Sequence, residues 1–136
     1  MMYKHILIPV ALDHEALVDK KLETCLHLLA DDGKVTLLTV LENVPGFVSE
    51  FVTVKSENHV SAKVRERLEA IVDGKPNMSC DVITGKPGVE ITRYAGANDV
   101  DLIMVGSHQP GIEDYFLGST ASRVARRSPC SVLIVR

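Results

Sequence analysis

Two glycine–serine pairs frame the stretch of this sequence that has the clearest chemical potential. Gly106-Ser107 directly follows an apolar run at residues 102–105, and Gly118-Ser119 stands about a dozen residues later, where a helix is predicted to begin. Glycine at the end of an element is typical of backbone that turns sharply or approaches a ligand closely. A helix start at Gly118-Ser119 would present unpaired backbone amides, which attract anions, and phosphate is the commonest match.

Basic residues follow on the same predicted helix. Arg123, Arg126 and Arg127 would add positive charge near such a phosphate. A second interpretation stays open, because a Gly-Ser pair before a helix is often only a cap, and arginines in a last turn often only complement the helix dipole. The sequence contains neither the GxxxxGK[ST] motif of a P-loop nor a GxGxxG motif after the first predicted strand.

These residues must be positioned by an alternation of strands and helices. Apolar runs predict strands at 5–10, 34–41, 78–84, 100–105 and 131–135, and helical spacing predicts helices at 16–30, 57–73, 88–97 and 119–127. The residues expected to face the core from the first two helices are Leu22, Cys25, Leu26, Leu29, Val60, Val64, Leu68 and Ile71. Residues 42–55 carry no readable element. The pattern predicts an α/β sandwich around a mostly parallel sheet.

In open parallel sheets, ligands bind beyond the carboxyl ends of the strands, where neighbouring connections diverge to opposite faces. The first and fourth predicted strands both end in unusual loops, at residues 9–13 and 106–111. If these two strands are neighbours, a ligand cleft lies between the two loops.

The bulk composition narrows the class of protein. The chain has 136 residues and a net charge of −3, so it has no overall attraction for nucleic acid or anionic membranes. No apolar stretch approaches the roughly 20 residues needed to span a bilayer, and no signal peptide pattern is present. Three scattered cysteines without a CxxC spacing argue against a disulfide framework and a zinc site. We expect one cytoplasmic domain over residues 1–136.

The segments ILIPVALD, LLTVL, DLIMVGSH and LGSTASRVARRSPCSVLIVR resemble the universal stress protein family over nearly the whole chain. The resemblance implies a three-layer α/β/α sandwich of the adenine nucleotide alpha hydrolase-like, or Rossmann-like, type. Together with right-handed crossovers it predicts a five-stranded parallel sheet in the order 3-2-1-4-5, with two helices on each face.

ATP-binding members of that family carry a Gly, two residues, a Gly, about nine residues and then Gly-Ser or Gly-Thr. Gly106 matches the first glycine and Gly118-Ser119 the last pair, whereas Gln109 replaces the middle glycine and the loop is one residue shorter. The stretch SHQPGIEDYFLGSTA instead resembles a subfamily with a Ser-x-x-Pro-x-Ile loop, whose members also bind nucleotides.

The resemblance therefore implies a set of nucleotide-binding residues. Those implied for phosphate and ribose are Gly106, Gln109, Gly118, Ser119 and Thr120. Val40 is implied to meet adenine through its backbone, and the remaining pocket residues are Pro9, Val10 and Val105. His108 is a further candidate, because it is the one histidine of five that falls in the predicted site loop.

One position departs from the family pattern. Ala11 stands where the family commonly has an acidic residue. Asp13, two residues later, either compensates as a ligand contact or caps the following helix. Glu113 and Asp114 are candidates to hold Mg²⁺ through water, although adjacent acids are also typical of a solvated loop.

The expected function is that of a regulatory stress-response protein, without catalytic residues, that binds ATP, with Mg²⁺ accompanying the nucleotide. The resemblance also implies a homodimer through residues 131–135, whose apolar edge strand would invite pairing. Two alternatives remain: an interaction dimer that has lost nucleotide, favoured by Ala11 and Gln109, and a slow ATP hydrolase. The sequence offers no nucleophile–base pair and no cationic cluster built around a γ-phosphate, on which phosphoryl transfer depends.

Overall fold

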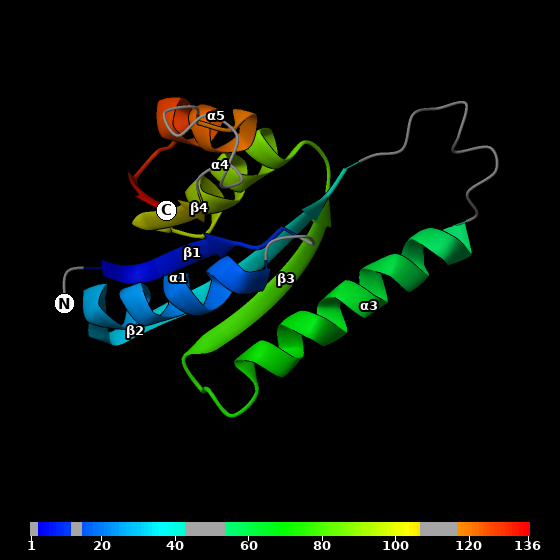
Figure 1. The fold of residues 1–136 in the computed structure, drawn as a ribbon, viewed down its shortest axis with the longest axis horizontal. Coiled ribbons are helices and arrows are strands. Elements are labelled where there is room, and N and C mark those ends of the chain that lie inside the picture. The colour runs from blue at the N-terminus through cyan, green and yellow to red at the C-terminus, as the bar shows by residue number, and fades with distance from the viewer. Residues whose placement is uncertain (1–2, 12–14, 43–53, 107–116) are drawn as a thin grey trace.

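The chain forms a parallel five-stranded sheet with helices on both faces (Figure 1). The computed structural model describes residues 3–11, 15–42, 54–106 and 117–136. The strands lie in the order β3-β2-β1-β4-β5, which confirms the predicted topology. Their bounds are Tyr3–Pro9 for β1, Leu29–Leu41 for β2, Met78–Thr84 for β3, Leu102–Gly106 for β4 and Ser131–Val135 for β5.

Within the described residues, two helices cover each face of the sheet, as predicted. Helices α1 (Glu15–Leu28) and α3 (Val54–Val72) pack on one face, and α4 (Pro87–Ala97) and α5 (Ser119–Arg127) pack on the other. Helix α3 lies mainly against β3, at one edge of the sheet, and its amino-terminal end extends beyond the sheet (Figure 1). No helix in the described ranges is long and apolar enough to cross a membrane.

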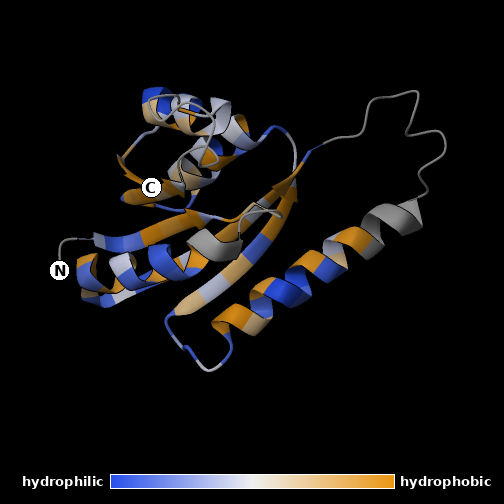
Figure 2. Ribbon diagram, in the orientation of Figure 1, coloured by the Kyte–Doolittle hydropathy of each residue, from blue (hydrophilic) through white to orange (hydrophobic). Residues whose placement is uncertain are grey.

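The inner strands β1 and β4 are apolar over their central residues because both faces of the sheet are covered. Ile6, Leu7 and Ile8 in the central strand β1 are 0% exposed, and their side chains alternate between the two cores. Figure 2 shows the same concentration of hydrophobic residues along the inner strands, whereas polar and hydrophobic residues alternate along the helices.

The junction between α1 and β2 differs from the prediction. The helix ends at Leu28 and the strand begins at Leu29, not at residue 34. Leu29 pairs with Tyr3 on β1, and regular pairing resumes only at Lys34 after an irregularity in the ladder. Gly33 lies within this irregular segment, and a Cβ there would meet the Leu29 Cδ1 atom at 2.6 Å. Gly33 therefore permits a close contact inside the strand. Strands β3 and β5 have the predicted bounds, and the ends of β1 and β4 differ from the predicted ones by one or two residues.

Two of the residues expected in the core lie on the surface instead. Leu26 is 69% exposed and Val60 is 48% exposed. On α1 the buried stripe runs through Val18, Lys21 and Cys25, so Leu26 falls one residue past it. On α3 the first buried residue among those whose side chains are described is Val64, four residues beyond Val60.

A buried histidine joins the amino ends of the central strands. His5 is 5% exposed, its Nδ1 lies 3.0 Å from the Asn98 carbonyl oxygen, and its Nε2 lies 2.8 Å from Thr36 Oγ1. The Asp101 carboxylate accepts hydrogen bonds from the backbone amides of Lys4 and His5, both at 2.9 Å. These contacts fasten β1 to its neighbours β2 and β4 at this end of the sheet.

Burial is the main influence on the charge state of His5. It lowers the pKa of the imidazole below its ordinary value of 6.5, and Lys34 acts in the same direction. The hydrogen bond to the Asn98 carbonyl and the carboxylates of Asp99 and Asp101 oppose the shift and only partly offset it. The folded protein therefore favours the neutral imidazole.

We predict that this histidine makes the folded state sensitive to mild acid. Below about pH 6.5 the unfolded chain binds more protons at this position than the folded chain, so the free energy of unfolding falls as the pH drops. His5→Gln should lower stability at pH 7.5 by about 1–2 kcal/mol through lost hydrogen bonds, and should flatten the pH dependence. Urea denaturation between pH 7.5 and 5 measures both effects. His27→Gln, at an exposed site on α1, is the control, and an equal flattening there would contradict the prediction.

Candidate functional site

The carboxyl ends of β1 and β4 meet where the chain diverges to opposite faces of the sheet. The two strands are neighbours, with Leu7 paired to Ile103, and this register places Pro9 level with Val105. From β1 the chain continues to α1 on one face, and from β4 it continues to α5 on the other (Figure 1). This is the geometry at which open α/β sheets form a ligand crevice.

Helix α5 points its amino end toward this edge of the sheet. Gly118 occupies the N-cap position with φ −59° and ψ 158°, and among the described residues no side chain caps the helix. The first helical hydrogen bond runs from the Ser122 amide to the Gly118 carbonyl oxygen at 2.9 Å. The amides of Ser119, Thr120 and Ala121 therefore have no acceptor inside the helix. Such amides are suited to hold an anion.

The amino end of α4 lies beside that of α5, which the sequence did not reveal. A cavity of about 420 Å³ opens between them and includes Gly88 from α4 and Ser119 and Thr120 from α5. Helix α4 also lacks a side-chain cap, and Pro87 at its start has no amide to satisfy. The sequence signal for this proximity was Lys-Pro-Gly at residues 86–88, because a glycine at a helix start lets another segment approach the helix closely.

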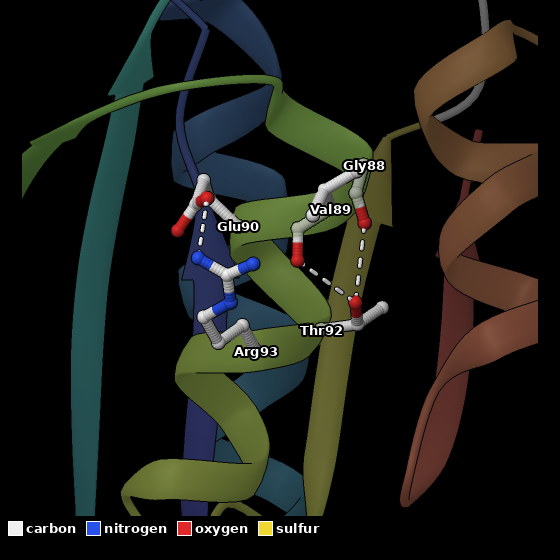
Figure 3. Close-up of polar contacts among 5 residues, drawn as sticks. All are labelled: Gly88, Val89, Glu90, Thr92 and Arg93. Atoms are coloured by element: carbon white, nitrogen blue, oxygen red, sulfur yellow. Dashed lines mark hydrogen bonds and ion pairs between the residues drawn. The ribbon is translucent and has the colours of Figure 1, made fainter.

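The cavity carries an excess of positive charge. Lys86 and Arg123 line it together with one acid, Glu42. A second acid close to the α4 start, Glu90, is held by Arg93 at 3.0 Å and so is partly neutralised (Figure 3). The balance favours an anionic over a cationic occupant.

Gly88 sets the distance between α4 and α5. A Cβ at this position would lie 2.7 Å from Arg123 Cδ and 3.1 Å from Arg123 Cβ, so a larger residue would displace the α5 side chain. Thr92 Oγ1 donates to the carbonyl oxygens of Gly88 and Val89, at 3.3 and 3.0 Å, which secures the first turn of α4 (Figure 3).

Just beyond the carboxyl end of β1, the backbone groups of Val10 already have hydrogen-bond partners on β2. The Val10 amide donates to the Leu38 carbonyl oxygen at 2.8 Å, and the Val10 carbonyl oxygen accepts from Thr39 Oγ1 at 2.8 Å. Val10 is buried, Ala11 is exposed, and Val40 is partly buried against the core beneath α4 and α5. The backbone groups of Val10 are therefore not free to bind a ligand. The side chains of Pro9 and Val10 can still line the pocket, as the resemblance implied.

A buried lysine reaches the same strand end, and sequence reasoning missed it. Lys21 on α1 is 4% exposed, and its Nζ donates to the Pro9 carbonyl oxygen at 3.2 Å. Burial lowers the pKa of its ammonium group. The signal was present in the spacing, because Lys21 follows Val18 by three residues and precedes Cys25 by four, on the buried stripe of the helix.

Part of the expected site lies outside the described residues: Asp13, His108, Gln109, Glu113 and Asp114. Within the described ranges, no group of three or more His, Cys, Asp or Glu side chains could hold a metal ion. The thiol of Cys25 is buried, which raises its pKa to about 11 and makes it a poor nucleophile.

We predict that Gly88→Ala destabilises the protein by about 1–2 kcal/mol, because the new methyl group collides with Arg123. Adding Arg123→Ala should recover part of this loss, since the Cγ and Cδ contacts disappear. Gly96→Ala, on the same helix with its nearest neighbour at 3.9 Å, should be neutral or stabilising. Thermal and urea unfolding of the four proteins test this packing. Equal effects of the two glycine substitutions would contradict it.

Comparison with known proteins agrees with this geometry. The model of the universal stress protein family matches residues 2–136. Universal stress protein G of Shigella flexneri is 32% identical over 145 residues, covering 99% of this chain and 100% of that protein. The solved structure of the hypothetical protein MJ0577 is 25% identical, with a TM-score of 0.82 over 99% of this chain and 96% of that chain.

The universal stress protein from Archaeoglobus fulgidus, solved in complex with dAMP, has the same fold. It is 14% identical, with a TM-score of 0.66 over 100% of both chains. The family match spans nearly every residue, and the strand order is the one that the resemblance implied. The chain belongs to the universal stress protein family.

Proposed function

We propose that this protein is a regulatory member of its family that binds ATP at the carboxyl edge of the sheet. The observation that carries the proposal is the uncapped amino end of α5, which opens onto a cavity lined by Lys86 and Arg123. Three amides without helical acceptors, two hydroxyls and two cations supply donors for a chain of phosphates.

The adenine and ribose would lie along the crevice between β1 and β4. Pro9 and Val10 form one wall, Gly106 ends β4 without a side chain, and Val40 offers backbone groups at the end of β2. The Archaeoglobus fulgidus relative in complex with dAMP supports an adenine nucleotide as the class of ligand. The described residues contain no metal-ligand cluster, so Mg²⁺ would be held chiefly by the phosphate oxygens.

A binding role fits the described residues better than a hydrolytic one. Ser119 and Thr120 have no hydrogen bond to a basic side chain within the described part of the chain, so neither hydroxyl is activated there. The cations at the cavity can hold phosphate without positioning an attacking water.

We predict that Gly118→Val greatly weakens ATP binding, whereas Ser119→Ala weakens it only about fivefold, as for the loss of one modest hydrogen bond of about 1 kcal/mol. The φ of −59° at Gly118 is accessible to any residue, so the valine acts through its volume rather than through backbone strain. Titration calorimetry measures both affinities, and circular dichroism checks folding.

Nucleotide extracted from the purified protein identifies the natural occupant. Unchanged ATP affinity in folded Gly118→Val would contradict the phosphate cradle. Absence of any nucleotide binding in the natural chain would favour the interaction module without a ligand. Turnover of ATP with Mg²⁺ would favour the hydrolase.

We further propose that two copies of the chain pair through β5. This strand lies at the edge of the sheet, and its apolar residues Val132, Leu133 and Ile134 are only partly buried, unlike those of the adjacent β4. An open apolar edge strand is suited to pairing with its own copy across a two-fold axis.

We predict that Leu133→Glu weakens the dimer at least tenfold, because the substitution places two like charges near the two-fold axis. Leu26→Glu is a control for the added charge alone, since Leu26 is 69% exposed on α1 and lies outside β5. Sedimentation velocity at micromolar concentration measures the association of each variant. A monomeric natural chain, or an unchanged dimer in folded Leu133→Glu, would contradict the proposal.

A further inference from the structure

The ammonium group of Lys21 lies at the end of the central strand, on the side that faces β4. Its Nζ donates to the Pro9 carbonyl oxygen at 3.2 Å. The next peptide groups along the chain bond to β2, through the Val10 amide and the Val10 carbonyl oxygen. Successive carbonyl groups of an extended strand point to opposite edges, so the Pro9 carbonyl points toward β4. Lys21 therefore places its charge beside the carboxyl ends of β1 and β4, where we place the nucleotide.

A charge in this position is unfavourable unless something compensates it. The side chain is 4% exposed, and within the described residues its hydrogen bond to one neutral carbonyl is its sole polar contact. Removing an ammonium group from water is strongly unfavourable, and a single carbonyl dipole offsets this only in part. The exposed Ala11 nearby supplies no carboxylate.

An apolar side chain would serve the core better at this position. The neighbours of Lys21 on the buried stripe of α1 are Val18 and Cys25, at 3% and 1% exposure, and both belong to the hydrophobic cluster on this face. Replacing a buried ion by an apolar group of similar volume is often neutral or stabilising. A role in binding a ligand therefore explains a lysine at this position better than a role in packing does.

We propose that Lys21 is a ligand-binding residue whose ammonium group selects polyphosphate-bearing ligands at the β1–β4 crevice. The inference rests on the proposed function, because it takes this crevice as the nucleotide site. Lys21 approaches from the α1 face, and the free amides of α5 approach from the opposite face. An anion above the two strand ends would then be held from both sides of the sheet.

The test compares three probes on four proteins by titration calorimetry. The probes are ATP, adenosine and inorganic pyrophosphate, and the proteins are the natural chain, Lys21→Met, Lys21→Arg and Lys20→Met. We expect Lys21→Met to weaken ATP and pyrophosphate at least tenfold and to leave adenosine within twofold. Lys21→Arg should retain most of the preference for ATP. Lys20→Met should behave as the natural chain, because exposed Lys20 donates to the Arg136 carbonyl oxygen instead.

A second readout separates ligand binding from a structural role. The unfolding midpoint of ligand-free Lys21→Met should equal or exceed that of the natural chain, because a buried charge has been removed. If methionine at this position prevents folding, Lys21→Gln supports the same comparison, since its amide can still donate to the Pro9 carbonyl.

The outcomes distinguish this inference from the proposed function. Equal weakening of ATP and adenosine, or no weakening of either, overturns the role of Lys21 while leaving nucleotide binding in place. A third outcome is that pyrophosphate binding depends on Lys21 but ATP binds no more tightly than pyrophosphate. This result supports the role of Lys21 and overturns the proposal that the ligand is an adenine nucleotide. A natural chain that binds neither ATP nor pyrophosphate overturns both.

Discussion

The central strand β1 is enclosed on every side, and this enclosure governs where polar chemistry can occur in the molecule. Helices cover both of its faces, and β2 and β4 occupy both of its edges. Its middle residues must then be apolar, since a buried polar side chain without a partner is strongly unfavourable. Polar and charged groups are confined to the two ends of the strand. His5 lies at one end and Lys21 reaches the other, each bonded to a backbone carbonyl.

The buried polar groups at the two ends of β1 differ in how completely their hydrogen bonds are satisfied. At the amino end, His5 has a hydrogen-bond partner for each ring nitrogen, and the neutral form of the ring suits its surroundings. At the carboxyl end, Lys21 has one carbonyl for three donors. The first arrangement is complete in itself and stabilises the fold. The second is incomplete within the described residues, as is usual for groups that meet a ligand.

The topology and most elements could be predicted from the sequence, because doubly buried strands leave continuous apolar runs and the family resemblance orders them. Helix α5 and strand β5 begin and end where they were predicted. The errors have physical causes. Leu29 was assigned to a helix because its spacing from Cys25 is helical, yet it pairs with Tyr3 in the sheet. The cavity beside α4 escaped prediction because it depends on the approach of Arg123 to Gly88, two residues far apart in the chain. Lys21 was missed because a lysine on a helix is ordinarily solvated.

The edge position of α3 and β3 makes this part of the molecule distinct from the rest. Strand β3 pairs only with β2, and α3 rests mainly on β3 with its amino-terminal end beyond the sheet. Both lie at this edge, apart from the pairing of β1 with β4 and from the packing of α4 on α5. Their amide hydrogens should therefore exchange with solvent through a local opening, at a lower free energy than those of the inner strands. Strand β3 leads directly into residues 85–88, which line the cavity beside α5, so a change in β3 would reach the cavity. None of the described cavity residues belongs to α3, so this helix is the part of the edge that can change in sequence, or engage other molecules, at little expense to the site.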